Sequence, residues 1–347
     1  FIAAVNPIRY AGAEPVFIGC GESLCLCPAL AGEWLAANTE QRDGKCVNRH
    51  TGAHVKALLA VHVFGNMANM PGLVELCRKY GLVLIEDSTE ALGTYYTEGP
   101  YRGKMAGTIG DIGVYSFNGN KIITGSSGGM LLTDDKEAAE KVRKWSTQSR
   151  ENAPWYQHEE LGYNYRMSNV IAGVVRGQMP HLEEHIAQKK AIYERYKEGL
   201  KGLPVRMNPY NEKKSEPNFW LSCLILDKEA MCRQVRSECE PLYIPETGKS
   251  CPTEILEAIA SINAEGRPIW KPMHMQPVYR MNGFVTREGD GRAKTNAYIA
   301  GGATGKDGNP LDIGMDIFHR GLCLPSDNKM TEDQQNRIIE VIRKCFE

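Results

Sequence analysis

The chain has 347 residues, of which 42% are hydrophobic and 24% are charged. This composition is typical of a globular protein with a large core, and the length predicts about two domains. The formal net charge is −1, so no basic field exists to attract nucleic acid, and no apolar run reaches the roughly 18 residues needed to span a bilayer.

The N-terminal stretch, FIAAVNPIRYAGAEPVFIG, lacks the basic region and the cleavage site of a signal peptide. It also lacks an initiator methionine and begins like the middle of an element, so we expect the natural start of the chain to be missing. Eleven cysteines are scattered along the sequence, and Cys25 and Cys27 are the only close pair. An odd number of cysteines without a secretion signal predicts free, mostly buried thiols in a reducing cytoplasm rather than a structural zinc site.

Residues 1–135 alternate between strand-like and helix-like segments. Short β-rich runs predict strands at 14–19, 55–64, 81–88, 112–117 and 128–133. Between the second and the third run, MPGLVELCRKYG (70–81) carries apolar residues at helical spacing and Gly81 as a candidate C-cap. Strand, helix and strand in this order predict a βαβ unit, and therefore parallel pairing within an α/β sheet.

Residues 135–200 are expected to be largely helical, and the character of the sequence changes after GLPVRMNPYNEKKSEPN. We therefore predict a large domain over 1–200 and a smaller C-terminal α+β domain over 201–347. The elements predicted in the smaller domain are a strand at 219–226, a Gly-, Asn- and Thr-rich excursion loop at 280–312 and a final helix at 331–347.

Three polar side chains follow predicted strands of the large domain. Asp87 ends LVLIED, where a carboxylate can bind a cation or a protonated ring nitrogen, because ligands collect at the carboxyl ends of strands in open α/β sheets. An alternative role for Asp87 is the N-cap of a helix over STEALG. Ser116 and Lys121 share the loop after the next strand, where a hydroxyl can donate to a phosphate and a desolvated amine can form a Schiff base. The alternative for Lys121 is a solvated loop residue.

An acid, a hydroxyl and a lysine in this order are what pyridoxal 5′-phosphate requires. The acid keeps the pyridine nitrogen protonated, the hydroxyl and backbone amides hold the phosphate, and the lysine holds the aldehyde carbon and later moves protons. With the blocks EDSTEALG, GTIGDIGVYSFNGNKIITGSSGGMLLTDD and GYNYRMSNVIAG, the chain resembles the sugar-nucleotide aminotransferases of the DegT–DnrJ type over essentially its whole length. The resemblance implies an α/β, aspartate-aminotransferase-like fold, fold type I of the pyridoxal-phosphate enzymes, with a mainly parallel sheet in the large domain.

The resemblance also implies roles for single residues. Lys121 matches the lysine that forms the internal aldimine and shuttles protons, and Asp87 matches the partner of the pyridinium nitrogen. Ser116, five residues before Lys121, matches the phosphate-binding serine. Glu90 stands where the family usually has Gln or His near the ring hydroxyl of the cofactor, and one branch of the family has Glu there.

Three further positions follow from the same resemblance, each with a structural alternative. Phe1 aligns with an aromatic residue that stacks on the cofactor ring, and its alternative is a buried strand residue. Asn164 in GYNYR resembles an asparagine that reaches the neighbouring subunit's phosphate across a dimer interface. Arg166 would meet an anionic group of the substrate, or would form a surface salt bridge.

One branch of the family resembles the chain most through GNKIIT, GYNYR and RPIWKPMHMQPVY. Its members aminate UDP-linked 4-keto-6-deoxy-N-acetylhexosamine, and the products feed bacillosamine- or legionaminate-type surface sugars. This implies that Trp270, Lys271 and His274 lie near the substrate or the rim of the site. The alternatives are simple packing for Trp270 and a satisfied loop histidine for His274.

The resemblance implies a homodimer with shared active sites that takes glutamate as amino donor and a nucleotide sugar as acceptor, with ping-pong kinetics. Family members carry an N-terminal helix and a loop at a helix N-terminus that donate backbone N–H groups to the cofactor phosphate. Nothing in this chain matches that loop, so a non-catalytic cofactor-binding or regulatory protein stays an alternative. We expect a truncated chain rather than a working variant.

Other classes of protein fit the sequence less well. A cofactor-dependent sugar dehydratase of the same family would be expected to carry histidine at position 121, where this chain has lysine. HLEEH (181–185) satisfies the H-x-x-E-H pattern of inverted zinc peptidases, but nothing nominates a third ligand, so no metal is predicted. GCGESL nearly fits the dinucleotide-binding G-x-G-x-x-G pattern, but Leu24 occupies the last glycine position.

Overall fold

The structure is a computed structural model and describes residues 1–290 and 304–347. The chain packs into two compact units. Unit 1 comprises Phe1–Ala37, Ala187–Tyr210 and Leu221–Glu347, and unit 2 comprises Asn38–Ile186 and Asn211–Trp220. Both units draw on separate stretches of sequence, whereas the predicted domains, 1–200 and 201–347, are contiguous and stay a prediction.

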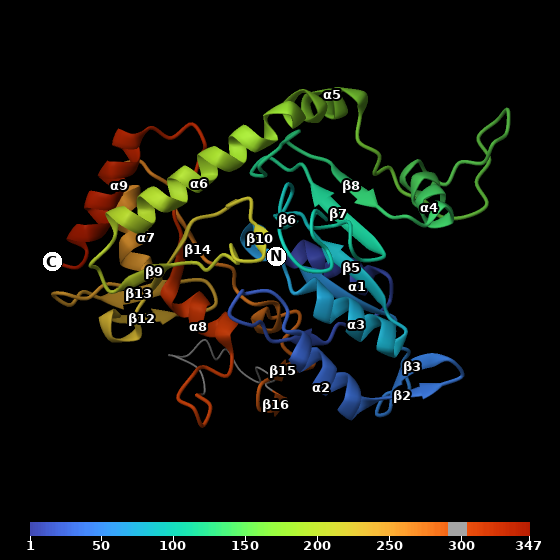
Figure 1. Cartoon of the computed structure of the whole chain (residues 1–347), viewed down its shortest axis with the longest axis horizontal. Helices are drawn as coiled ribbons and strands as arrows, with labels where there is room; N and C mark the ends of the chain where they lie inside the picture. Colours follow the sequence, from blue (N-terminus) through green and yellow to red (C-terminus); the bar gives the residue numbers. More distant parts are fainter. Residues whose placement is uncertain (291–303) are drawn as a thin grey trace. The chain divides into compact units, whose positions relative to one another are not determined.

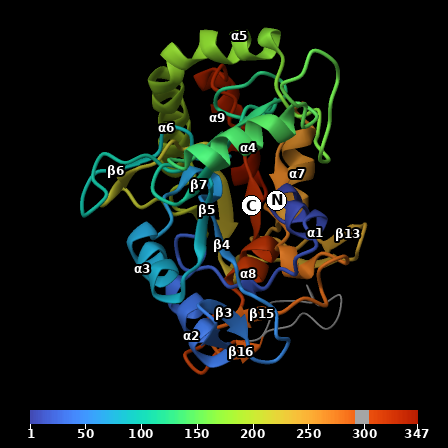
Figure 2. The same ribbon diagram turned by 90° about the vertical axis from the view of Figure 1, so that its right-hand side faces the viewer.

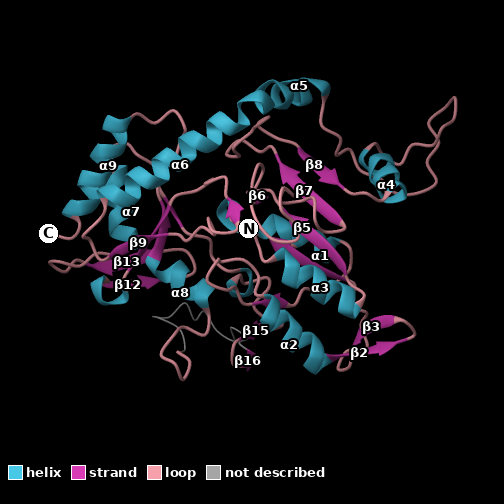
Figure 3. Ribbon diagram, in the orientation of Figure 1, coloured by secondary structure: helices cyan, strands magenta, loops and turns pink. Residues whose placement is uncertain are grey.

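Unit 2 is built on a four-stranded sheet in the order β4-β5-β7-β8, of which Figure 2 labels β4, β5 and β7 and Figures 1 and 3 label β5, β7 and β8. Its strands are β4 (Ala57–Val61), β5 (Val83–Asp87), β7 (Ile112–Ser116) and β8 (Gly129–Leu132). The first three run parallel, as the βαβ pattern predicted, and β8 is antiparallel to β7. Parallel strands end at one edge of a sheet, so Asp87 and Ser116 close their strands on the same side.

Helix α3 (Met70–Tyr80) is the crossover between β4 and β5 and lies beside β5 in both ribbon views (Figures 1 and 2). The Asn69 side chain accepts from the N–H of Gly72 at its start, and Gly81 ends it in the left-handed conformation that needs no Cβ. Its buried side chains recur at helical spacing and are Met70, Leu73, Val74 and Cys77. The predicted helix and its glycine C-cap are confirmed.

Three helices lie in the region that the sequence predicted to be helical. They are α4 (Lys136–Ser146), α5 (Asn169–Gln178) and α6 (Leu182–Gly199), and Asp135 and Ser168 cap the first two. Residues 147–168 between α4 and α5 form no helix and are tied by isolated bridges, among them Thr147 with Asn164. Unit 2 also holds two antiparallel pairs: β2 (Thr39–Arg42) with β3 (Lys45–Asn48), which form a hairpin, and β6 (Tyr95–Tyr96) with β10 (Ser215–Glu216), which are distant in the chain.

Unit 1 contains an antiparallel sheet in the order β14-β17-β11-β9. Its strands are β14 (Arg267–Pro268), β17 (Gly321–Cys323), β11 (Cys223–Leu226) and β9 (Val205–Met207). Leu224 and Leu226 of β11 join a core cluster with side chains of α7 (Pro252–Ala260) and α9 (Glu332–Lys344). A capping box between Thr331 and Gln334 starts α9, so the predicted final helix is confirmed.

The remaining elements of unit 1 are short. They are the 3₁₀ helices Ile2–Ala4, Lys228–Ala230 and Met273–Met275, the helices α1 (Asn6–Tyr10), α2 (Pro28–Asn38) and α8 (Ile313–Arg320), the pair β12 (Arg233–Arg236) and β13 (Pro241–Ile244), and the strands β1 (Phe17–Ile18), β15 (Phe284–Thr286) and β16 (Gly289–Asp290). The predicted excursion loop at 280–312 holds β15 and β16, and its residues 291–303 lie outside the described part. Among the helices described, none has the length and apolar character required to cross a membrane.

Candidate active site

The loop after β7 places Ser116 and Lys121 on one tight turn. The Ser116 hydroxyl accepts from the N–H of Asn118 at 3.2 Å, and the N–H of Lys121 donates to the carbonyl of Asn118 at 3.0 Å. Phe117 closes the base of the loop, because its N–H donates to Gly128 and its carbonyl accepts from Gly125. The lysine is therefore held by a short, internally bonded loop at the strand edge where Asp87 ends β5.

Lys121 has an unusual electrostatic setting. Its side chain is half-buried, and this burial lowers the pKa of its amine below the ordinary value, while the carboxylates of Glu90 and Asp87 act in the opposite direction. Both acids thus lie close enough to the amine to influence its charge. An amine in this setting loses its proton more readily than a solvated lysine, which is what nucleophilic attack on a carbonyl needs.

Glu90 lies on the loop after β5 and is 6% exposed. Burial raises the pKa of its carboxyl, while Lys121 and the N–H of Phe64, which donates to Glu90 Oε2 at 2.7 Å, act to lower it. The backbone of Phe64 adopts a left-handed conformation, with φ of 60°, that residues other than glycine rarely take. The Glu90 carboxylate therefore stabilises a strained turn, and its charge also acts on the amine of Lys121.

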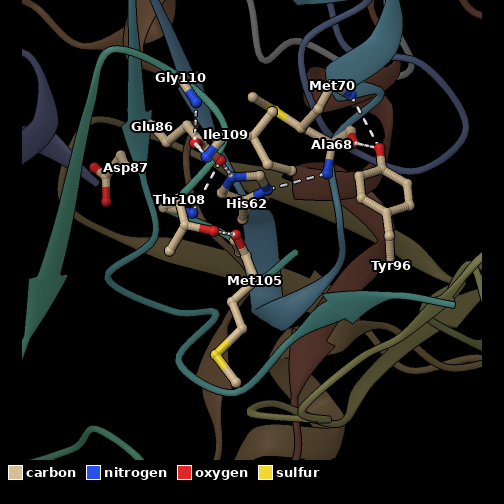
Figure 4. A network of polar contacts seen from close by, with 12 residues as sticks. His62, Ala68, Met70, Glu86, Asp87, Tyr96, Met105, Thr108, Ile109 and Gly110 are labelled. Atoms are coloured by element: carbon tan, nitrogen blue, oxygen red, sulfur yellow. Dashed lines mark hydrogen bonds and ion pairs between the residues drawn. The ribbon is translucent and has the colours of Figure 1, made fainter. Parts of the chain in front are cut away.

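Asp87 and its neighbour Glu86 point to opposite sides of β5 (Figure 4). Asp87 is 7% exposed, and its Oδ1 accepts from the N–H of Thr89 at 3.1 Å. The carbonyl of Asp87 accepts from the N–H of His62 at 3.0 Å, so the end of β5 is tied to the end of β4. Asp87 forms this local turn but does not start a helix, since residues 88–94 consist of turns and irregular backbone.

Glu86 is a fully buried carboxylate whose two oxygens accept four hydrogen bonds (Figure 4). His62 Nε2 and the N–H of Gly107 bond one oxygen at 2.9 Å each, and the N–H groups of Ile109 and Gly110 bond the other at 2.7 and 2.5 Å. Burial alone would raise the pKa of Glu86, but these hydrogen bonds, that from His62 foremost, hold it below its ordinary value. Glu86 is therefore an ionised anchor behind the strand that presents Asp87.

The bonds of His62 assign its tautomer. Its Nδ1 accepts from the N–H of Ala68 at 3.1 Å, so Nε2 carries the proton and donates to Glu86. Tyr96 completes this network, since its hydroxyl donates to the carbonyl of Ala68 and accepts from the N–H of Met70 (Figure 4). The loop that leads from β4 into α3 is thus fixed to β5 by polar contacts.

The other two candidate residues of unit 2 lie on its surface. Asn164 and Arg166 are exposed, and the N–H of Arg166 donates to the carbonyl of Ser146 at 3.1 Å. Their segment also exposes large apolar side chains, namely Trp155, Tyr156, Leu161, Tyr163 and Tyr165. The predicted roles of Asn164 and Arg166 stay predictions.

The remaining candidates lie in unit 1. Phe1 is 70% exposed and precedes the 3₁₀ helix Ile2–Ala4, so it is not the buried strand residue of the alternative. Lys271 pairs with Glu238 at 3.4 Å, and Trp270 is half-buried. His274 Nε2 lies 2.6 Å from Asp312 Oδ2, and the histidine ring stacks on Phe284 with centroids 3.5 Å apart. These contacts are those of a satisfied histidine, and the predicted substrate contact of His274 stays a prediction.

His62, Glu86, Asn218 and Trp220 were not predicted from the sequence. A weak signal existed for the first two, because a histidine and an acid that end neighbouring buried strands, AVHV and LIED, need partners. Trp220 lies under the lysine, whose Nζ is 4.2 Å from the ring centroid. No local pattern signals Asn218 or Trp220, because their partners are about a hundred residues away in the chain.

The HLEEH segment forms no three-ligand group. His185 Nδ1 is engaged by the carbonyl of Ile122 at 3.0 Å, and His181 Nδ1 by Glu184 at 3.2 Å. Within residues 1–290 and 304–347, the three ligand atoms that lie within 4.8 Å of one another belong to Cys232, Cys251 and Glu254 of unit 1. The cysteines of the described part are all free, as predicted.

The residues gathered on unit 2 fit pyridoxal 5′-phosphate by the chemistry of their donors. Asp87 offers a carboxylate for a pyridinium nitrogen, and Lys121 offers an amine whose pKa burial has lowered. Ser116 offers a hydroxyl on a glycine-rich turn whose backbone N–H groups suit a phosphate. Gly128 in this loop has φ of 102°, a conformation that L side chains rarely adopt, so glycine is required where the loop turns back into β8.

Comparison with known proteins places these residues in a family context. The profile of the DegT/DnrJ/EryC1/StrS aminotransferase family matches residues 1–289. EpsN of Bacillus subtilis (strain 168), whose description names a pyridoxal phosphate-dependent aminotransferase, is 38% identical over 347 residues, which span 100% of this chain and 75% of EpsN. The GDP-perosamine synthase of Vibrio cholerae is 30% identical over 349 residues, which span 100% of this chain and 77% of the synthase.

Solved structures share the fold. A DegT DnrJ EryC1 StrS aminotransferase from Brucella abortus aligns with a TM-score of 0.75 at 20% identity, covering 100% of this chain and 77% of its own. The pyridoxal-phosphate form of Spr1654 from Streptococcus pneumoniae aligns with a TM-score of 0.72 at 16% identity, covering 100% of this chain and 80% of its own. The predicted aspartate-aminotransferase-like fold is confirmed.

Proposed function

Because the chain belongs to the DegT/DnrJ/EryC1/StrS aminotransferase family, the pyridoxal 5′-phosphate-dependent sugar aminotransferases, we propose that Lys121 is its reactive lysine and that glutamate donates the amino group to a nucleotide-linked 4-keto-6-deoxy sugar. One observation carries the assignment of the lysine. Its amine is half-buried, its pKa is lowered by that burial, and the carboxylates of Glu90 and Asp87 act on it from the same unit.

The bound cofactor supplies an electron sink and an aldehyde that accepts and releases amines. The Asp87 carboxylate would hold a proton on the ring nitrogen, because a carboxylate favours a cation beside it. Ser116 and the N–H groups of its turn would bind the phosphate. Glu90 would lie near the ring hydroxyl. Lys121, once its amine is free, takes a proton from the donor carbon and returns one to C4 of the sugar.

The substrate is proposed at two levels. The names of the relatives support a nucleotide sugar, since they include GDP-perosamine synthases and, in Acidithiobacillus ferrooxidans, a UDP-N-acetyl-3-dehydro-alpha-D-glucosamine 3-aminotransferase 32% identical over 210 residues, which span 60% of this chain. We propose the UDP-linked 4-keto-6-deoxy-N-acetylhexosamine branch on the sequence motifs quoted above. Arg166, Trp270, Lys271 and His274 are the proposed substrate contacts.

We further propose a homodimer with shared active sites. The segment 155–165 supports it, because aromatic and aliphatic side chains that are 53–94% exposed there leave a large apolar surface. Asn164 lies within this segment and would reach the phosphate of the neighbouring site. The cytoplasmic location predicted from the free cysteines stays a proposal.

An absorption spectrum with added cofactor tests the reactive lysine. We expect a long-wavelength band in the wild type, its collapse on addition of glutamate, and no band in Lys121→Ala. Lys141→Ala is the matched control, since Lys141 forms a surface ion pair with Glu160. A band that survives in Lys121→Ala would refute the assignment.

Product analysis tests the substrate. With glutamate and UDP-linked or GDP-linked 4-keto-6-deoxy sugars offered in parallel, we expect the mass of the 4-amino product from the UDP-linked N-acetylhexosamine. Turnover of the GDP-linked sugar alone would contradict the proposed UDP-linked substrate and would favour the activity of a perosamine synthase. Cofactor binding without turnover of any sugar would favour the non-catalytic alternative.

A further inference from the structure

Trp220 reaches the reactive lysine from a distant part of the sequence. Residues Asn211–Trp220, here called the strap, pack with unit 2 although they lie about a hundred residues beyond Lys121 in the chain. Trp220 ends the strap, is 2% exposed and is among the largest fully buried side chains of the described structure. Its position therefore depends on how the strap is anchored.

Asn218 anchors the strap to the loop that carries Glu90. It is fully buried, and its Nδ2 donates to the carbonyls of Glu90 at 2.9 Å and Leu92 at 3.0 Å. Its own N–H donates to Thr94 Oγ1 at 3.1 Å, and its Oδ1 accepts from the N–H of Trp220 at 3.0 Å. The backbone of Trp220 is thus tied to the loop of one acid that acts on the lysine.

The indole contacts two consecutive residues of the lysine loop. Its Nε1–H donates to the carbonyl of Asn120 at 2.9 Å, and the Nζ of Lys121 lies over the ring at 4.2 Å from its centroid. The first contact fixes the backbone that precedes the lysine, and the second gives the ammonium the negative face of the ring. One side chain therefore controls both the position of the lysine and the environment of its charge.

We propose that Trp220 is a positioning residue that holds the free amine of Lys121 over its indole face whenever that amine is not bonded to the cofactor. This proposal rests on the proposed function, in which the lysine must be released to move protons. A flexible four-carbon side chain, once free, would otherwise sample many rotamers. The ring keeps the amine at the edge of the site where Glu90 and Asp87 also act on it, and the bond to Asn120 keeps the loop from drifting.

The groups that set the charge of Lys121 can be separated by experiment. Burial favours the neutral amine, and the carboxylates of Glu90 and Asp87 favour the ammonium. The indole face also favours the ammonium. A less negative electrostatic potential on that face would therefore increase the fraction of neutral amine at a fixed pH. A tryptophan that only fills space would not produce this change.

The test uses the full chain without added cofactor and acetic anhydride as an amine reagent, with peptide mass spectrometry to follow Lys121. Only the neutral amine reacts, so the acetylation rate at pH 7 reports the fraction of neutral Lys121. Fluorinated tryptophans are incorporated in place of tryptophan. Each fluorine makes the electrostatic potential of the ring face less negative and adds little volume. We expect the rate at Lys121 to rise with the number of fluorines, by about two- to fivefold over the series.

Trp220→Phe, grown with the same fluorinated tryptophans, is the matched control and should show no such dependence. A flat rate in the fluorinated wild type would overturn the proposal, and so would an equal rise in Trp220→Phe, which would assign the effect to another tryptophan. A rate at Lys121 that does not change with fluorination of the wild type overturns the proposal even if Trp220→Phe does not fold. Failure here leaves the Lys121→Ala spectrum unaffected, so it is distinct from failure of the proposed function.

Discussion

At the scale of single residues, the two neighbouring carboxylates of β5, Glu86 and Asp87, have different roles. Glu86 faces inward and accepts four hydrogen bonds, which hold its pKa below the ordinary value, and Asp87 faces the opposite side beside the lysine loop. The inward acid fixes the strand end from which the outward acid works. Because both of its oxygens accept hydrogen bonds from backbone N–H groups and from His62, Glu86 stabilises the strand end and takes no part in the proposed chemistry.

Glu86→Gln tests this anchor. The amide keeps the shape but turns an NH2 group toward N–H donors, so we expect the free energy of unfolding to fall by about 2–4 kcal/mol. Urea denaturation at pH 7 measures the change. Glu140→Gln on exposed α4 is the control and should stay within about 0.5 kcal/mol of the wild type.

The pH dependence of this anchor has a fixed sign. The pKa of folded Glu86 lies below its unfolded value, so its contribution to stability is complete above that unfolded value and is lost as the pH falls through the folded pKa. The gap in stability between the wild type and Glu86→Gln should therefore narrow as the pH is lowered through and below about 4, the usual range for a glutamate. A gap that stays constant to pH 3 would contradict an ionised Glu86.

Glu90→Gln tests the field around the lysine. The Glu90 carboxylate acts to raise the pKa of Lys121 against burial, so its removal should lower that pKa further. We expect faster acetylation of Lys121 at pH 7 in Glu90→Gln than in the wild type, measured by peptide mass spectrometry. An unchanged or slower rate would show that Glu90 does not act on the amine as a charge.

Some of these site residues could be predicted from the sequence, and others could not. Asp87, Ser116 and Lys121 follow β-rich runs, so strand order alone brings them to one edge. Glu86 gave only a weak signal, because an acid in a buried strand needs a partner but no local pattern identifies that partner. Trp220 was hidden because its contact depends on the folding of a distant strap, which no local periodicity encodes.

At the scale of elements, the close approach of β7 to the preceding loop positions the lysine. A Cβ at Gly113 would lie 1.9 Å from the carbonyl oxygen of Gly107, so the loop and the strand touch through their backbones. The same loop supplies the N–H groups of Gly107 and Gly110 to Glu86. Strand β7, whose end carries Ser116, is thus packed directly on the anchor of β5.

Gly113→Ala tests this contact. The methyl group must displace either β7 or the loop, so we expect a loss of about 3 kcal/mol or more in the free energy of unfolding, and weaker cofactor binding. Gly173→Ala is the control, because a Cβ at Gly173 in α5 meets nothing within 4 Å and alanine favours helix. Thermal unfolding followed by circular dichroism measures the stability of both variants. Equal unfolding midpoints for Gly113→Ala and Gly173→Ala would contradict the prediction.

The elements themselves were largely predictable, and the exceptions have physical causes. Helix α3 carried its cap, its apolar spacing and its terminal glycine in the sequence. The predicted strand at 219–226 begins only at Cys223, because Asn218 captures the N–H of Trp220 and Phe219 adopts a left-handed φ of 53°. Side-chain hydrogen bonds to the backbone thus displaced the pairing that the apolar residues favoured.

At the scale of the whole molecule, the surface of unit 2 leads to an expected assembly. Leu161 is 94% exposed and Tyr165 is 76% exposed, and Tyr163 and Tyr165 stack with ring centroids 4.7 Å apart. Ordered aromatic side chains with this exposure are typical of a surface that a partner covers. Asn164 lies between these two tyrosines, so the surface and the proposed contact to the neighbouring site coincide.

The double variant Leu161→Glu/Tyr165→Glu tests the homodimer. Four buried carboxylates would lie across the proposed interface, so we expect sedimentation to change from a dimer in the wild type to a monomer in the variant at micromolar concentration. Cofactor affinity should fall with it, because Asn164 would no longer reach the neighbouring phosphate. Leu242→Glu/Ile244→Glu is the matched control, since these side chains are 68% and 57% exposed on unit 1, and it should remain a dimer. A dimeric Leu161→Glu/Tyr165→Glu with unchanged cofactor affinity would place the interface elsewhere.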